Sequence, residues 1–308
     1  MFDHEPRRGA ARGANGRRNR LRTGAIGAAA VVAATSLTAC SRADEGPATL
    51  EEMQERGYIT AAINNEPPFG YIDDDGNVTG AAPELLEAMA AELGVDEVRA
   101  ESVDWDALIP GLKSGRFDVV AAGMYITPER CDEVAFMEPD YRVQEAFMVP
   151  KGNPEELETY ESVAENEDAT IAVLNASVEQ GYAETAGVPD GQMETVSGAA
   201  DAIELLQNGR VDAVALSTFS LNYQLEERDL GDDFEVTEGF IPVDENGEEV
   251  SPAGGFAFAA DNTEVRDEFN GVLSRFKEDG TLRETVEPFG FDETSDPGDL
   301  TTEQLCAE

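Results

Sequence analysis

The chain has 308 residues, with 21 Lys and Arg side chains against 65 Asp and Glu side chains, and a formal net charge of −44 at pH 7. This length predicts roughly two domains, and a hydrophobic fraction of 41% is sufficient for packed cores. So large an acidic excess excludes a protein that binds the nucleic-acid backbone, because such proteins need a basic surface.

The first 40 residues have the pattern of an export signal. Seven arginines lie within residues 1–22, an uncharged run of small and apolar residues follows at 23–39, and Cys40 comes next. This order predicts a secretory signal peptide over residues 1–39. The sequence before Cys40 resembles the bacterial lipobox, which predicts a lipidated Cys40, a tether over residues 40–49 and an anchor on the outer face of the cell membrane. An ordinary signal peptide with an unmodified cysteine is the alternative, and the export route (Sec or twin-arginine) stays open.

The chain contains one histidine and three cysteines. His4 lies in the segment that we expect to be removed, so the mature chain lacks the residue that Ser-His-Asp and Cys-His catalysis and most zinc sites require. No phosphate-binding glycine loop or dinucleotide motif is present in the sequence, and we expect neither a cofactor nor a metal. Cys131 and Cys306 remain as an even pair outside the reducing cytosol. This pair predicts a disulfide that tethers the C-terminal tail, with two free buried thiols as the alternative.

The mature chain is even more acidic than the full one, because residues 1–39 contain seven basic and two acidic side chains. Such a surface repels itself in dilute buffer and tolerates concentrated salt, where electrostatic screening is strong. We interpret the acidity as adaptation to a saline exterior. A secreted protein that is merely acidic is the alternative.

Strands and helices alternate in two stretches of the chain. The first stretch predicts strands at 58–63, 98–102 and 117–122, and helices at 83–93 and 105–114. The second predicts strands at 170–174 and 211–216, and helices at 178–186 and 199–207. This alternation is typical of a mainly parallel sheet covered by helices, so we expect two α/β lobes.

A seven-residue pattern occurs in both stretches. Residues 115–121 read Gly-Arg-Phe-Asp-Val-Val-Ala, and residues 209–215 read Gly-Arg-Val-Asp-Ala-Val-Ala. Each copy has the composition of a helix end, a glycine cap and a buried strand. Ligands of open α/β sheets bind beyond the carboxyl ends of the strands. If the lobes share this unit, the residues that follow each copy, which begin at Gly123 and Ser217, face the same cleft.

The loop after the first predicted strand contains Glu66, Pro67, Pro68 and Phe69. Each proline fixes its own φ and restricts the residue before it, so this loop is stiff and extended. Glu66 and Phe69 therefore have little conformational entropy to lose when a ligand binds. The alternative is a surface turn that carries one acid among many.

Residues 125–130 read Tyr-Ile-Thr-Pro-Glu-Arg and have the pattern of a helix start, with Thr127 as N-cap and Pro128 in the first turn. Arg130 has the wrong charge for the positive end of a helix. An anion bound there would contact both the helix N-terminus and the guanidinium, which fits a carboxylate bidentately. An ion pair with one of the many acids is the alternative.

Trp105, the one tryptophan in the sequence, opens the helix after the second predicted strand. With Phe69 and Tyr125 it offers three aromatic faces, and such faces bind delocalised or quaternary cations. Each of these aromatic residues taken singly is more often part of a core. With a negative Glu66 and a positive Arg130, however, they predict a site for a small zwitterion that has a flat or bulky cationic part.

Over residues 50–292 the sequence resembles the extracellular solute-binding proteins of polar amino acid ABC importers. The resemblance rests on the Gly-Arg-Phe-Asp-Val strand and on the Thr-Pro-Glu-Arg and Val-Ala-Phe motifs that follow it. Within that family the sequence is most similar to the ectoine- and hydroxyectoine-binding branch, in residues 65–71, 108–112, 121–131, 149–154 and 286–291.

The family implies a two-lobed periplasmic-binding-protein fold of type II, with two crossover strands as the hinge. Lobe I then comprises residues 50–145 and 252–308, and lobe II comprises residues 146–251. By the same resemblance Arg130 binds the ligand carboxylate and Glu66 binds the N–H groups of a cyclic amidinium. The rings of Phe69, Trp105 and Tyr125 enclose the ligand.

Four polar residues of lobe II complete the site that the resemblance implies. Ser177 matches a hydroxyl that assists the ligand carboxylate, and Asn175 is near enough in sequence to take that role. Amino-acid binders of the family usually have an aspartate after the second-lobe strand, where it binds the α-ammonium group. This chain has Ser217 and Thr218 there, which favours a ligand without a primary amine.

The resemblance thus implies a monomeric, non-enzymatic lipoprotein that captures ectoine or hydroxyectoine outside the cell and delivers it to an ABC permease in the membrane. Two alternatives remain at this level. One is a binder of a polar or cationic amino acid or a betaine. The other is a cyclohexadienyl dehydratase-like enzyme on the same fold, against which the lack of histidine counts.

Overall fold

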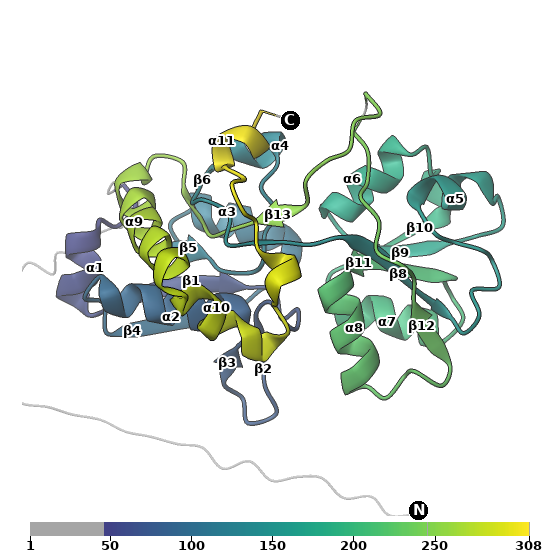
Figure 1. Ribbon diagram of the computed structural model, residues 1–308, viewed down its shortest axis with the longest axis horizontal. Coiled ribbons are helices and arrows are strands. Elements are labelled where there is room, and N and C mark those ends of the chain that lie inside the picture. Colours follow the sequence, from purple (N-terminus) through teal and green to yellow (C-terminus); the bar gives the residue numbers. More distant parts are fainter. Residues whose placement is uncertain (1–45, 245, 308) are drawn as a thin grey trace, which may run out of the picture. The chain divides into compact units, whose positions relative to one another are not determined.

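The computed structural model describes residues 46–244 and 246–307. Two five-stranded sheets lie at the centres of two lobes, and helices cover the sheets (Figure 1). The predicted signal peptide, Cys40 and most of the predicted tether lie outside the described residues. Within the described part of the chain, no helix has the length and apolar character that crossing a membrane requires.

The sheet of lobe I has the strand order β4-β1-β5-β14-β6. Strands β4, β1 and β5 are parallel, and β14 is antiparallel to both of its neighbours. Alternate residues of β1 face opposite sides, so Ile59 and Ala61 pack beneath α2 and α9, whereas Ala62 packs against Leu108 and Leu112 of α3. The strands are β1 (Tyr58–Ile63), β4 (Glu97–Ser102), β5 (Val119–Val120), β6 (Val134–Phe136) and β14 (Ala257–Ala259). The helices are α1 (Leu50–Arg56), α2 (Ala81–Glu92), α3 (Leu108–Lys113), α4 (Pro128–Cys131), α9 (Thr263–Asp279), α10 (Thr281–Val286) and α11 (Thr302–Leu305), with 3₁₀ turns η2 (Trp105–Ala107), η4 (Glu287–Phe289) and η5 (Glu293–Ser295).

The sheet of lobe II has the order β10-β9-β11-β8-β12, with β10, β9 and β11 parallel. Strand β8 is antiparallel to both β11 and β12. Ala172 and Leu174 of β9 pack beneath α7, whereas Ile171 and Val173 pack against Tyr160 of α5. The strands are β8 (Glu145–Pro150), β9 (Ile171–Leu174), β10 (Met193–Val196), β11 (Ala213–Ser217) and β12 (Phe234–Val236). The helices are α5 (Tyr160–Glu165), α6 (Val178–Thr185), α7 (Ala199–Gln207) and α8 (Thr218–Glu227), with the 3₁₀ turn η3 (Asp190–Gln192).

The chain crosses between the two sheets twice, once after β6 and once after β12 (Figure 1). The two crossing segments are paired by backbone hydrogen bonds. Strands β7 (Tyr141–Arg142) and β13 (Ala253–Gly254) pair at the side of lobe I, and Glu145 pairs with Phe240 at the side of lobe II. A hairpin of β2 (Tyr71–Ile72) and β3 (Val78–Thr79) extends from lobe I. These paired crossings have the arrangement of a hinge.

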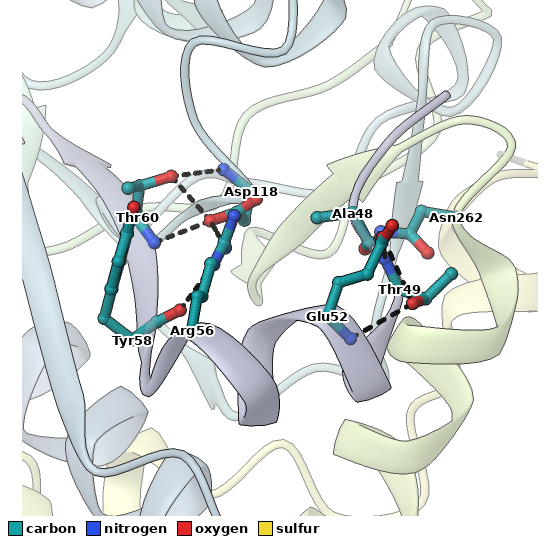
Figure 2. A network of polar contacts seen from close by, with 8 residues as sticks. All are labelled: Ala48, Thr49, Glu52, Arg56, Tyr58, Thr60, Asp118 and Asn262. Carbon is teal, nitrogen blue, oxygen red and sulfur yellow. Dashed lines mark hydrogen bonds and ion pairs between the residues drawn. The ribbon is translucent and has the colours of Figure 1, made fainter. Parts of the chain in front are cut away.

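The repeated seven-residue pattern has the same structural role in both lobes. In lobe I, the Asp118 carboxylate accepts hydrogen bonds from the backbone N–H and hydroxyl of Thr60, at 2.7 and 2.6 Å. In lobe II, Asp212 accepts the same pair of bonds from Thr170, at 2.8 and 2.9 Å. Arg56 also forms an ion pair with Asp118 (Figure 2). Each aspartate thus bonds a threonine in or just before the neighbouring strand, Thr60 within β1 and Thr170 directly before β9, and the two lobes are built alike at this point.

Two predicted elements of lobe I differ in extent from the observed ones. The strand predicted at 117–122 is regular only over β5; at Asp118 the Thr60 N–H donates to the side-chain carboxylate, whereas the Thr60 carbonyl accepts from the Asp118 backbone N–H. The helix predicted at 105–114 begins with the 3₁₀ turn η2 and becomes α-helical only at Leu108. Neither change moves the residues that follow the strands away from the cleft.

A disulfide joins Cys131, at the end of α4, to Cys306 in the C-terminal tail. Leu305, next to it, is buried in the core beside α3. The tail is held further by the Thr302 hydroxyl, which donates to the backbone carbonyl of Met137 at 2.7 Å. The C-terminus therefore supports the short helix that carries Arg130.

Candidate functional site

A cavity lies where the two lobes meet. Residues of both lobes line it: Glu66, Phe69, Trp105, Gly123, Tyr125, Arg130, Leu174, Ser177, Val178, Glu179, Leu216 and Ser217. Eight of these twelve residues are among the ten ligand contacts predicted from the sequence. A wider cleft shares Trp105, Tyr125, Arg130 and Ser177 with the cavity and so forms its mouth.

The loop after β1 holds Glu66 and Phe69 in the wall of the cavity. Glu66 and Gly70 exchange two backbone hydrogen bonds, at 2.9 and 3.1 Å, which close the loop on itself. The Phe69 ring is buried against Tyr141, with 5.0 Å between the ring centroids. Gly123 has a φ of 63°, and a Cβ atom there would overlap the Phe69 ring, so this position requires glycine.

Glu66 is a buried carboxyl group that accepts hydrogen bonds from both lobes. The Ser220 hydroxyl on α8 donates to its Oε1 atom at 2.5 Å, and the Asn64 amide donates to its Oε2 atom at 2.9 Å. Burial raises the pKa of Glu66 to about 7, and the two hydrogen bonds oppose that shift. Glu66 is therefore poised to gain or lose its charge near neutral pH.

Arg130 is 8% exposed and forms no ion pair within 4.0 Å in the part of the chain that the structure describes. The N-cap Thr127 accepts a bond from its backbone N–H, and one guanidinium nitrogen donates to the carbonyl of Tyr125 at 2.9 Å. Its guanidinium carbon lies 5.3 Å from the centroid of the Trp105 ring. Burial lowers the pKa of Arg130 from its usual value, and the nearby Glu179 opposes this shift. A buried guanidinium without an ion pair is a site for an anion.

Trp105 lies between the lobes. Its ring packs against the cores of both lobes, and its indole N–H donates to the carbonyl of Ala176, in lobe II, at 3.3 Å. Ala176 has a φ of 59°, a conformation that residues with a Cβ atom rarely adopt. Ala176 immediately precedes Ser177, the N-cap of α6. Trp105, Phe69 and Tyr125 all line the same cavity.

Two predicted contacts, Asn175 and Thr218, do not line the cavity. The Asn175 side chain is exposed and donates to the Asp106 carboxylate of lobe I at 2.8 Å, so it bridges the lobes at the rim. The backbone N–H of Thr218 donates to the carbonyl of Gln144, at the first turn of α8. Ser177 and Ser217, by contrast, reach the cavity and cap helices α6 and α8.

Three polar residues in and behind the cavity wall are absent from the ligand contacts predicted from the sequence, although one of them, Ser220, lies in the stretch that was expected to face the cleft. Glu179, in the first turn of α6, lines the cavity, and burial raises its pKa, whereas a bond from Ser177 and the charge of Arg130 lower it. Ser220 reaches Glu66 from the first turn of α8. Glu145, behind Tyr125, is fully buried. The signal for the first two was their place in the first helical turn after a serine N-cap. The signal for Glu145 was a charged residue at the start of an apolar strand.

Two lobes joined by paired crossings, with a charged and aromatic cavity between them, are the architecture of a protein that binds a small solute between its lobes. The chain belongs to the bacterial extracellular solute-binding proteins, family 3, whose sequence pattern matches residues 59–292.

Similar proteins have names that refer to the binding of small solutes. A probable amino-acid ABC transporter periplasmic-binding protein of Sinorhizobium fredii, y4tE, is 34% identical over 286 residues, which cover 91% of this chain and 92% of that protein. The arginine-binding extracellular protein ArtP of Bacillus subtilis is 26% identical over 80% of this chain and 89% of its own length. The crystal structure of EhuB in complex with hydroxyectoine has 36% sequence identity and a TM-score of 0.76, covering 83% of this chain and 97% of that one.

The protein is therefore an extracellular solute-binding protein of an amino-acid ABC transporter, which binds a small ligand and delivers it to a membrane permease. Its relatives are substrate-binding proteins rather than enzymes, which decides against the dehydratase-like alternative.

Proposed function

We propose that the protein captures ectoine or hydroxyectoine, zwitterions with a carboxylate and a cyclic amidinium, and presents them to its permease in the closed form. The observation that carries this proposal is the buried Arg130, which has no ion pair within the described residues and faces a cavity that also contains Glu66. A carboxylate bound to Arg130 would supply the missing charge. Glu66, once ionised, would bind the amidinium N–H groups.

The aromatic residues and the missing aspartate support the same class of ligand. Phe69, Trp105 and Tyr125 border the cavity, and their faces attract a delocalised cation. Ser217 and Ser220 occupy the start of α8, and Ser220 is already bonded to Glu66. At the start of α8, an α-ammonium group would therefore meet the hydroxyls of Ser217 and Ser220 and not a carboxylate. The likeness to EhuB, whose crystal structure contains hydroxyectoine, agrees with this assignment.

A polar or cationic amino acid is the second candidate, because the relatives identified by sequence have names that refer to amino acids. Glu179 favours this candidate, since it adds a second carboxyl group to the cavity beside Glu66. Isothermal titration with ectoine, hydroxyectoine, glycine betaine, arginine and glutamine separates the two. We expect a binding signal with ectoine and with hydroxyectoine. Binding of arginine without any response to ectoine would refute the proposal.

The remaining parts of the proposal concern maturation and organisation. Residues 1–39 are removed as a signal peptide, Cys40 is lipidated, and residues 40–49 tether the protein to the outer face of the membrane. Lobe I comprises residues 50–145 and 252–308, lobe II comprises residues 146–251, and the protein acts as a monomer. We expect Cys40→Ser to release the protein into the medium, and mass spectrometry of the mature N-terminus to show an acylated cysteine in the unaltered protein. A non-acylated N-terminus elsewhere would contradict this.

A further inference from the structure

Glu145 is a fully buried carboxyl group at the hinge, and it does not line the ligand cavity. It is the first residue of β8, where the chain enters the sheet of lobe II. Its backbone N–H donates to the carbonyl of Phe240 at 3.0 Å, and the N–H of Phe240 donates to the carbonyl of Glu145 at 2.8 Å. Phe240 lies on the segment by which the chain leaves lobe II. Glu145 therefore joins the two crossing segments to each other.

The side chain of Glu145 connects the cavity wall to the core of lobe II. The Tyr125 hydroxyl donates to Oε1 at 3.0 Å, and the Tyr160 hydroxyl lies within 3.5 Å of Oε2. Tyr125 belongs to lobe I and borders the cavity. Tyr160 is buried in lobe II, where its ring contacts Phe147 and Phe240 edge-on. One carboxyl group thus links an aromatic wall of the binding site to the rigid part of the other lobe.

The surroundings of Glu145 favour the uncharged acid. It forms no ion pair among the described residues. The charged groups that act on it are the carboxyl groups of Glu179 and Glu66. Burial first, and then the charge of Glu179, raise the pKa of Glu145 well above its usual value. A neutral acid keeps an acceptor for Tyr125 and gains an O–H group that can face Tyr160.

We propose that Glu145 is a positioning residue for ligand binding, which holds the Tyr125 ring in the cavity wall and ties it to the hinge when the lobes are closed. This role rests on the proposed binding site but not on the identity of the ligand. Glu145 acts through Tyr125 alone. Its removal weakens binding because the ring loses its fixed orientation and its hydroxyl loses its partner.

Two substitutions at this position separate positioning from charge. Glu145→Gln presents an amide oxygen to Tyr125 and an N–H donor to Tyr160, as the neutral acid does. We expect its affinity for ectoine, measured by isothermal titration, to stay within about threefold of the unaltered protein. Glu145→Leu fills the space without an acceptor, and we expect it to bind at least about tenfold more weakly, the cost of one unsatisfied buried hydroxyl. If Glu145→Leu does not fold, Glu145→Asp, which withdraws the carboxyl group from Tyr125, is expected to show the same loss.

A double-mutant cycle with Tyr125→Phe tests the path of the effect. Tyr125→Phe keeps the ring and removes the hydroxyl. If Glu145 acts through that hydroxyl, Glu145→Leu weakens binding less than threefold in the Tyr125→Phe background. Purely additive losses would overturn the proposal, and so would a Glu145→Gln variant as weak as Glu145→Leu with an unchanged melting temperature.

The choice of ligand keeps this test separate from the proposed function. If the unaltered protein does not bind ectoine but binds arginine, the ectoine assignment fails, and the same cycle is run with arginine. The role of Glu145 then stands or falls on the coupling between positions 145 and 125. Additive losses with a ligand that does bind leave the ectoine assignment untouched and refute the positioning role alone.

Discussion

Acidification is expected to weaken ligand binding through Glu66. Burial raises the pKa of this carboxyl group to about 7 in the unliganded protein, whereas an amidinium bound to it stabilises the ionised form and lowers its pKa. The unliganded protein therefore holds more protons than the complex, and protons favour release. The affinity therefore falls as the pH decreases below 7, and it continues to fall until the pH reaches the lower pKa that Glu66 has in the complex.

The magnitude follows from the ionised fraction of Glu66. With a pKa of about 7, the ionised fraction is about one half at pH 7, about one tenth at pH 6 and about one hundredth at pH 5. The apparent Kd for ectoine should thus rise about fivefold from pH 7 to pH 6, about tenfold from pH 6 to pH 5, and about 100-fold between pH 8 and pH 5. A 100-fold change in Kd corresponds to roughly 2.7 kcal/mol of binding free energy.

The assay is isothermal titration with ectoine at pH 5, 6, 7 and 8 at constant ionic strength. Constant ionic strength matters because a protein with a formal charge of −44 responds strongly to screening. Repeating the pH 7 titration in two buffers of different ionisation enthalpy counts protons, and about half a proton should be released per ligand.

Two variants provide the controls. Ser220→Ala removes a hydrogen bond that lowers the pKa of Glu66, so the loss of affinity should begin at a higher pH. Glu66→Gln should bind weakly and without this pH dependence. A Kd that is constant from pH 5 to 8 in the unaltered protein would refute the reasoning, as would an equal slope in Glu66→Gln.

Four further predictions address the other groups of the site and the tail. Arg130→Gln should cost about 3 kcal/mol of binding free energy by titration, because a buried carboxylate loses its charged partner, and a loss below about 1 kcal/mol would exclude Arg130 as the carboxylate site. Trp105→Ala should cost about 1–2 kcal/mol while circular dichroism stays unchanged, and equal affinity would remove this ring from the site. Ser177→Ala should weaken binding more than Asn175→Ala, because only Ser177 lines the cavity, and the reverse order would place the carboxylate at Asn175. Cys306→Ser should lower the free energy of unfolding by about 2–5 kcal/mol, since the disulfide closes a loop with a sequence separation of 175 residues, and an unchanged melting temperature would contradict this.

The general architecture could be predicted from the sequence because it depends on local patterns. The strand predicted at 58–63 coincides with β1, and the helix predicted at 199–207 coincides with α7. The two-lobed α/β fold is confirmed. Glu66 and Tyr125 line the cavity because each follows a strand of the sheet in lobe I, and the carboxyl ends of parallel strands lie at the same edge of a sheet.

The sequence could not identify residues whose role depends on contacts between the lobes. Glu179 and Glu145 are two acids among 65, and their burial results from packing against segments far away in the chain. Asn175 has the residue type of a ligand contact, but its side chain bonds Asp106 across the rim. Only the tertiary structure distinguishes a polar group in the cavity from one that bridges the rim of the cavity.

The position of Trp105 has a practical consequence. The sequence has no other tryptophan, and this indole touches both lobes and lies beside the guanidinium of Arg130. Its ultraviolet emission therefore originates from a single place, the seam where the solute is enclosed. We therefore expect the colour and intensity of its emission to change when the solute binds, so that the unlabelled protein can serve as its own optical sensor.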